Sequence, residues 1–340
     1  DRRRGPHPRR GPDLSACCPV KLLLLAAAAL AAMIVAVVVG SVSIPAGGLL
    51  GGLLDPGSEY GPIVWQLRIP RIVLAFLVGG ALGTCGVALQ ALVRNPLAEP
   101  YILGISGGAG LGAVAAIAFG LSGLLAVPAA AFAGALGASL VVYGIAVVQG
   151  TRLEPRVLIL AGAIVAAFCG AITSAILTVS EAAQLRNAFL WLLGGFATAS
   201  WASVGVFLAY AIVPLTGLAL SGRALDLVSL GDEPAHALGL DPRRTRTLVF
   251  VATALLTAAS VAVAGMIGFI GLIAPHAMRG WLGPVHRRLL PGAFLASGGL
   301  LVLADALART VMRPTELPVG TITALIGVPL FAVLVRRSLT

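Results

Sequence analysis

Side chains that could carry out chemistry are few in this sequence and do not form a catalytic set. The four histidines, His7, His236, His276 and His286, fall in four different polar segments, and no His, Cys, Asp or Glu pair has metal-ligand spacing. No nucleophile and base form a recognisable arrangement. The sequence therefore predicts no catalytic residue, no metal site and no resident cofactor.

Nucleotide-binding motifs are also missing. The single lysine, Lys21, follows Val20, so the sequence has no G-x-x-x-x-G-K-[ST] segment and we expect no ATP bound by a P-loop. Gly108, Gly110 and Ala113 have the spacing of a dinucleotide fingerprint, but that fingerprint follows a strand, and here it opens an apolar segment. Close packing or a lined cavity explains these small residues better.

One ionisable pair lies within an apolar segment. Asp305 stands one helical turn before Arg309, at the i,i+4 spacing that brings a carboxylate and a guanidinium together on one helix face. Ionisable residues within a membrane form ion pairs or proton relays. We favour the ion pair and keep the relay as the alternative, since Asp305 is the acid that lies well inside a span.

The composition indicates whether the segments around these residues face water or lipid. Of the 340 residues, 59% are hydrophobic and 11% are charged, whereas a soluble domain carries about 25% charged residues. Lipid must therefore cover most of the surface, and the 43 glycines suit close helix packing in a bilayer. The net charge of +10 comes from short arginine clusters between apolar runs, which argues against nucleic-acid binding.

About 20 apolar residues are needed to cross a bilayer as a helix. By this measure the sequence predicts an all-α polytopic membrane protein with about ten transmembrane helices in a domain at 21–340, after a basic cytoplasmic tail at 1–20. A short surface helix is expected between the fifth and sixth spans. The predicted spans are 21–43, 71–92, 101–120, 124–149, 157–179, 190–215, 247–267, 268–283, 292–310 and 318–335.

The basic residues predict the orientation. With the N-terminus inside, 18 of the 23 basic residues fall on the inner side, and the remaining 5 on the outer side are Arg68, Arg71, Arg186, Arg309 and Arg313. Cytoplasmic loops of membrane proteins carry such an excess of positive charge. The bias agrees with an even number of spans and predicts that both termini are cytoplasmic.

Two polar segments interrupt the apolar pattern on the inner side. The first, RNPLAEPYILGISGG at 94–108, joins an Asn-Pro step to a glycine-rich helix start. Its residues alone favour an Asx-type cap at Asn95, with Leu97 packed in the turn. The second, at 221–246, has helix start and stop signals and one short apolar face, which favours docking of a cytosolic partner over a solvated connector.

Motifs around both segments resemble the FecCD-type permeases. These are the membrane subunits of binding-protein-dependent ABC importers for ferric siderophores, haem and cobalamin. The resemblance runs from Arg68 to the C-terminus. It rests on RIPR (68–71), GGALGTCGVALQALVRNPLAEPYILGISGGAGLG (79–112), LGDEPAHALG (230–239), GFIGLIAPHAMR (268–279) and HRRLLPGAFLASGGLLVLADALARTVMRPTELPVGTITALIGVPLFAVLVRR (286–337).

The resemblance implies a transport subunit in a bacterial plasma membrane, and not an enzyme. It implies a second permease subunit, identical or homologous, two cytosolic ATPase subunits that bind ATP, and an extracytoplasmic substrate-binding protein. An inverted repeat should relate spans two to five with spans seven to ten. A ferric siderophore is the expected substrate. The alternatives are an ion- or proton-coupled secondary transporter and a non-transporting membrane anchor or receptor.

Roles of individual residues follow from the resemblance. Arg68, Arg71 and Arg309 are expected to dock carboxylates of the binding protein, with snorkelling to lipid headgroups as the alternative. Asn95 and Leu97 are expected in the inner gate that closes the pathway. The segment at 221–246 is expected to be the cytoplasmic coupling loop, and four of its residues are expected to contact the ATPase, namely Gly231, Ala235, Leu238 and Gly239.

Overall fold

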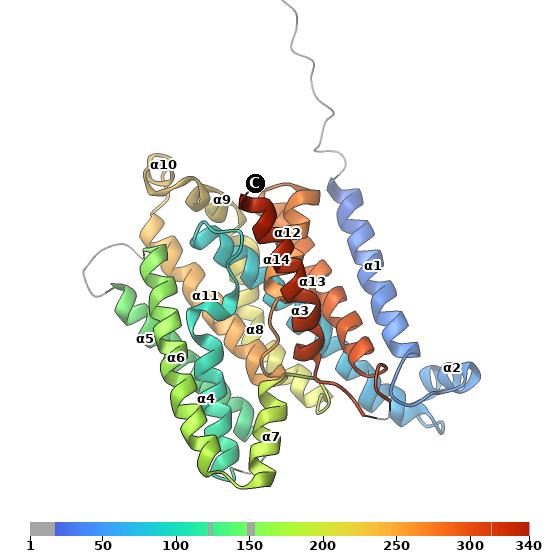
Figure 1. Ribbon diagram of the computed structural model, residues 1–340. Helices are drawn as coiled ribbons and strands as arrows, with labels where there is room; N and C mark the ends of the chain where they lie inside the picture. The colour runs from blue at the N-terminus through green and yellow to red at the C-terminus, as the bar shows by residue number, and fades with distance from the viewer. Residues whose placement is uncertain (1–17, 122, 124, 148–153, 314, 340) are drawn as a thin grey trace, which may run out of the picture.

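The apolar runs fold into helices, which satisfy their own backbone hydrogen bonds as a lipid environment requires. The computed structural model describes residues 18–121, 123, 125–147, 154–313 and 315–339. Every regular element in those residues is helical, and the helices pack side by side in one bundle (Figure 1). Residues 1–17 of the predicted basic tail lie outside them, as does Arg152 of the predicted inner side.

The chain order of the helices follows the predicted spans with several additions. A π-helical turn, η1 (Ile63–Arg68), leads into α3, and a 3-10 turn, η2 (Pro100–Leu103), precedes α4. The α-helices are α1 (Cys18–Val38), α2 (Ala46–Leu54), α3 (Ile69–Leu92), α4 (Ile105–Ala118), α5 (Ala126–Val147), α6 (Pro155–Val179), α7 (Ala182–Leu192), α8 (Trp201–Leu220), α9 (Gly222–Leu230), α10 (Asp232–Ala237), α11 (Pro242–Ala264), α12 (Ile270–Leu282), α13 (His286–Ala308) and α14 (Val319–Leu339).

Each predicted span contains a helix, but the helices differ in length. Shorter apolar stretches are Ile105–Ala118, which is α4, and Val319–Val333 within α14. The 13 residues of α12 reach only about 20 Å, less than the roughly 30 Å of a bilayer core. The structure therefore shows an all-helical membrane protein in which the described residues form seven long apolar spans together with shorter helices. By length and composition the long spans are Pro19–Val38, Ile63–Leu92, Ala126–Val147, Arg156–Val179, Trp201–Leu220, Pro242–Ala264 and His286–Ala308.

Backbone breaks explain the short helices. Gly104 precedes α4 with a φ of +73°, and Phe269 precedes α12 with a φ of +68°. A positive φ suits glycine and is unusual for phenylalanine. The predicted division between spans 247–267 and 268–283 therefore exists, although α11 already ends at Ala264 and residues 265–269 are not helical.

The predicted span at 190–215 is wrong at its start. α7 ends at Leu192, Gly194 has a φ of +70°, and α8 begins only at Trp201. The Ser200 hydroxyl caps α8 by accepting a hydrogen bond from the N–H of Ser203. The short helix expected before the sixth span is confirmed as α7.

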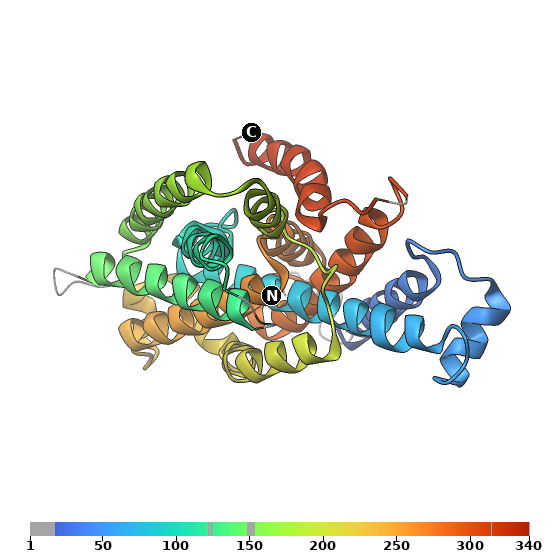
Figure 2. The same ribbon diagram turned by 90° about the horizontal axis from the view of Figure 1, so that it is seen from below.

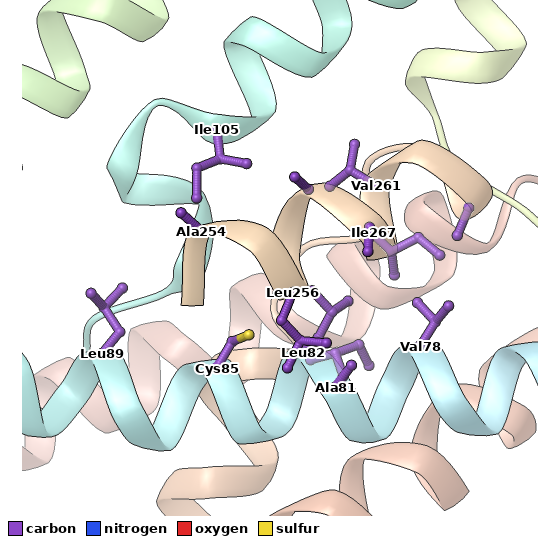
Figure 3. Packing of buried hydrophobic residues seen from close by; sticks show 14 of the residues in the cluster. Val78, Ala81, Leu82, Cys85, Leu89, Ile105, Ala254, Leu256, Val261 and Ile267 are labelled. Carbon is purple, nitrogen blue, oxygen red and sulfur yellow. The ribbon is translucent and has the colours of Figure 1, made fainter. Parts of the chain in front are cut away.

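Close backbone approach builds the core around α3. Leu82 and Cys85 of α3 lie beside Leu256 of α11 in the buried cluster of Figure 3. Gly86 lies so near α12 that an added Cβ would stand 1.8 Å from the carbonyl oxygen of Gly271. Such contact supplies the packing that holds helices together where lipid offers no hydrophobic driving force.

Helices of the two halves contact each other in matching ways. α3 packs against α12 and α13, and α11 packs against α4 and α5. α4 lies between α5 and α6, as the view along the bundle in Figure 2 shows. The start of α1, the end of α14, α9 and α10 lie at one end of the bundle, here called the inner end (Figure 1). The opposite end, with α2 and α7, is called the outer end.

Candidate functional site

Four charged residues form an outer cluster, consisting of Arg71, Asp305, Arg309 and Glu316. Arg71 Nη2 lies 2.8 Å from Asp305 Oδ1, and Arg71 Nη1 lies 2.8 Å from Glu316 Oε2. Arg309 Nε lies 3.0 Å from Asp305 Oδ2, so the predicted ion pair is confirmed. Asp305 is 1% exposed, and two guanidinium groups compensate its buried charge.

Arg68 and Arg309 also donate hydrogen bonds to carbonyl groups at the end of α1. Arg68 donates hydrogen bonds of 2.6 Å to the Val37 carbonyl and 2.5 Å to the Val42 carbonyl. Arg309 Nη2 donates to the Ala36 carbonyl at 3.3 Å. The last carbonyls of a helix lack partners within the helix, and these guanidinium groups supply them.

The fold thus brings together the three arginines expected to dock the binding protein. Each has partners within the chain, and Arg68 and Arg309 are only 5% and 3% exposed. Arg71 is more accessible, with 12% of its side chain exposed. The sequence pattern found the Asp305–Arg309 pair, but no local signal connected Arg71 with Asp305 or Arg68 with α1.

A cavity of about 550 Å³ lies beside the outer cluster. Residues of α4, α5, α7, α8, the end of α11 and the start of α14 line it, together with the loop between α7 and α8; Trp191 of α7 and Phe196 of that loop are among them. Arg71 and Glu316 contribute charged groups to its wall. Within the described ranges, no group of three or more His, Cys, Asp or Glu could hold a metal ion.

The turn at 94–98 has the local structure that its residues predict. Asn95 Oδ1 accepts a hydrogen bond from the N–H of Leu97 at 2.9 Å, which confirms the Asx-type turn. Asn95 is exposed and Leu97 is half-buried at the end of α3. Arg94, just before them, has a φ of +52°.

Two residues of the segment at 94–108 hydrogen-bond to the non-helical backbone before α12, and neither was predicted from the sequence. The Glu99 carboxylate accepts a hydrogen bond from the N–H of Phe269, and the Tyr101 hydroxyl accepts one of 2.8 Å from the N–H of Ile267. These N–H groups belong to irregular backbone and have no helical partner. An acid and a tyrosine among apolar residues were the available signal, but nothing in the sequence named their partners.

The predicted coupling loop folds into α9 and α10. Gly231 and Gly239 have φ values of +119° and +80°, which favour glycine at these helix ends. Leu238 is 60% exposed, but Ala235 is fully buried. The single apolar face expected here is therefore corrected, because Ala235 packs inside the chain and Leu238 points to the surface.

Both short helices are tied to longer ones. Asp232 of α10 lies 2.5 Å from Arg246 of α11, measured from Oδ1 to Nη2. Asp226 of α9 lies 2.6 Å from His286 of α13, measured from Oδ1 to Nδ1. The coupling loop therefore rests on two helices that cross the bundle.

Sequence relatives identify the family. The model of the FecCD transport family matches residues 26–337. The chain belongs to the FecCD transport family. This FecCD chain is 44% identical over 274 residues to the cobalamin import system permease protein BtuC of Halobacterium salinarum, covering 81% of the chain and 73% of that relative. It is 42% identical over 283 residues to the hemin transport system permease protein HmuU of Yersinia pestis, covering 81% and 84%.

The FecCD fold has also been observed in a solved transporter. A structure described as an inward-facing conformation of a metal-chelate type ABC transporter superposes with a TM-score of 0.84 and 32% identity, covering 94% of this chain and 99% of that one. The resemblance to FecCD-type permeases is therefore confirmed. This FecCD chain is a membrane-spanning permease subunit of an ABC importer and not the ATPase.

Proposed function

We propose that this permease moves a ferric siderophore, or a related iron chelate, haem or cobalamin, into the cytoplasm. The observation that carries this proposal is the identity of 42–44% to permeases named for hemin and cobalamin import, over 81% of the chain. The apolar cavity at the outer end agrees with a bulky cargo held by weak contacts. Selectivity then depends mainly on the binding protein that delivers the cargo.

The transport cycle proposed for this chain is alternating access between inverted halves. The matching contacts of α3 with α12 and α13, and of α11 with α4 and α5, support such a repeat. Two of the shorter helices, α4 and α12, each follow a residue with a positive φ. Irregular backbone at membrane depth is tolerated against protein or a water-filled path, which suits gating elements. Asn95 and Leu97, at the inner end, are proposed to close the path.

ATP hydrolysis is proposed to act on the chain through partners at the inner end. Two cytosolic ATPase subunits would dock on α9 and α10, where Leu238 offers an exposed apolar side chain. Gly231 and Gly239 allow the tight helix ends that present it, and Ala235 supports α10 from inside. A second permease subunit, identical or homologous, would complete the path.

The binding protein is proposed to dock at the outer end. Arg71 is the most accessible of the three candidate arginines, and it shares the Asp305 carboxylate with Arg309. An arginine can hold a carboxylate through two parallel hydrogen bonds. The proposed location is a bacterial plasma membrane with both chain ends in the cytoplasm, which the shared inner end of α1 and α14 supports.

Transport by the reconstituted complex tests this function. The permease, its ATPase and its binding protein are placed in vesicles, and uptake of a ferric siderophore, hemin and cobalamin is compared with and without ATP. We expect ATP-dependent uptake of one of these three compounds, and the ferric siderophore is the one we expect. Uptake that instead collapses with an uncoupler at constant ATP would favour the secondary-transporter alternative.

A further inference from the structure

Asp226 of α9 caps a helix other than its own. Its Oδ1 accepts a hydrogen bond of 2.9 Å from the backbone N–H of His286 and lies 2.6 Å from His286 Nδ1. His286 is the first residue of α13, and Val285 before it provides no side-chain cap. Because a carboxylate can only accept, Nδ1 carries the hydrogen and one oxygen receives both donors. The dipole of α13 favours a negative charge at this position.

The backbones of the same two helices also meet. An added Cβ at Gly222, the first residue of α9, would lie 2.9 Å from Cγ and 3.0 Å from the backbone N of Arg287. Leu225 and Val228 of α9 are buried, so this face of the helix is seated inside the chain. α9 therefore cannot shift without moving the start of α13 or breaking these contacts.

α13 connects this junction with the outer cluster. Its 23 residues extend about 34 Å, close to the thickness of a bilayer core. Near its other end Asp305 contacts Arg71 of α3, and Arg309 donates to the Ala36 carbonyl of α1. One helix thus joins the short inner helices to the ion pairs of the outer end.

We propose that Asp226 and His286 are positioning residues for transport, which carry a displacement of α9 and α10 into α13 and so alter the packing of the outer cluster. The inference rests on the proposed function, because it requires an ATPase that moves α9 and α10. Asp232 and Arg246 tie α10 to α11, so the two links distribute the movement between two helices that cross the bundle.

The test compares Asp226→Ala with Asp226→Asn in the complete importer, reconstituted in vesicles with its ATPase and binding protein. ATP hydrolysis and substrate uptake are measured at equal amounts of folded complex. We expect Asp226→Ala to keep ATPase association and hydrolysis while uptake per ATP falls about tenfold, the change produced by about 1.4 kcal/mol. Asp226→Asn keeps a side-chain oxygen that accepts both hydrogen bonds and should retain most of the uptake per ATP.

The ratio of uptake to hydrolysis separates coupling from stability. A merely structural role lowers both rates together, and an unchanged ratio in Asp226→Ala overturns the proposal. If Asp226→Ala does not assemble, His286→Phe replaces it, because this variant loses the ring hydrogen bond and keeps the backbone cap. His286→Phe should also lower the ratio of uptake to ATP hydrolysis. An unchanged ratio in this variant also overturns the proposal.

A matched control is available at the outer end. Glu181 immediately precedes α7 and takes part in its capping box. Glu181→Ala therefore removes a helix cap without breaking a link to α13. Its uptake per ATP should equal that of the wild type. A wild-type complex that binds no ATPase and takes up no substrate overturns the proposed function and this inference together. A transporting wild type with an unchanged variant ratio overturns the inference alone.

Discussion

Arg71 of α3 and Asp305 of α13 are 234 residues apart in the sequence, and their side chains meet at 2.8 Å. The contact joins two helices from opposite halves of the chain at the outer end. Arg309 and Glu316 extend it into a four-residue cluster in which Asp305 is the most buried member. This arrangement makes Asp305 a structural acid, held between two cations, and leads to the first two predictions.

Replacing Asp305 should destabilise the fold, but uptake should still be driven by ATP. Asp305→Asn leaves Arg71 and Arg309 without their shared carboxylate, and breaking a buried ion pair typically costs about 3–5 kcal/mol. Glu316→Gln is the milder control, since Glu316 is 28% exposed. Thermal unfolding in detergent measures both. Uptake by folded Asp305→Asn should still require ATP and resist an uncoupler. Uncoupler-sensitive uptake in the wild type would restore the proton-relay alternative.

Charge reversal at Arg71 should weaken docking of the binding protein. Arg71→Glu sets a carboxylate against the expected carboxylate of the partner, and a loss of about 1.4 kcal/mol corresponds to a tenfold weaker affinity. Arg186→Glu on α7 is the control, because Arg186 is an exposed arginine at the outer end that does not belong to the outer cluster. Affinities are compared at equal folded amounts and two salt concentrations. Equal affinities for Arg71→Glu and the wild type would remove the docking role.

An added charge at Leu238 should weaken binding of the ATPase. Leu238 is 60% exposed, so Leu238→Asp leaves the fold intact and places a carboxylate in the expected apolar contact. Burying an unpaired charge is unfavourable, so the subunits should co-purify less. Leu54→Asp is the control, since Leu54 is 79% exposed in α2 at the opposite end. Full transport by Leu238→Asp would show that the coupling assignment is mistaken.

A methyl group at Gly86 should disturb the contact between α3 and α12. The added Cβ of Gly86→Ala would stand 1.8 Å from the Gly271 carbonyl oxygen, and overpacking of this kind costs about 1–3 kcal/mol or more. Gly137→Ala in α5 is the matched control, because nothing lies within 4 Å of its added Cβ. In thermal unfolding, Gly86→Ala should have a lower midpoint temperature than Gly137→Ala. An equal midpoint for both would mean that α3 and α12 pack less closely.

Loss of the Glu99 brace should destabilise the break before α12. Glu99→Ala leaves the N–H of Phe269 without its acceptor, and an unpaired buried donor costs about 1–3 kcal/mol. Glu99→Gln keeps an oxygen that can accept and should be close to wild type. Hydrogen exchange at residues 265–270 measures the local effect. Exchange that is equally slow in both variants would show that Tyr101 and packing suffice.

Local patterns in the sequence determined a substantial part of this structure. Long apolar runs predicted all-helical membrane segments, because a helix satisfies its backbone within one continuous stretch. The i,i+4 spacing predicted the Asp305–Arg309 pair, and the Asn-Pro step predicted the turn at Asn95. The motif blocks predicted the family. Each of these features depends on residues close together in the chain, so a short window of sequence contains its cause.

Tertiary structure alone decided which distant residues meet. Arg71 contacts Asp305, Arg68 donates to carbonyls at the end of α1, and Glu99 accepts from the N–H of Phe269. None of these pairs has a local signal, because one guanidinium or carboxylate can satisfy any partner that packing brings near. The break at Gly194 and the positive φ of Phe269 were set in the same way. Their backbone is held by neighbouring helices and braces, and those contacts exist only once the bundle has assembled.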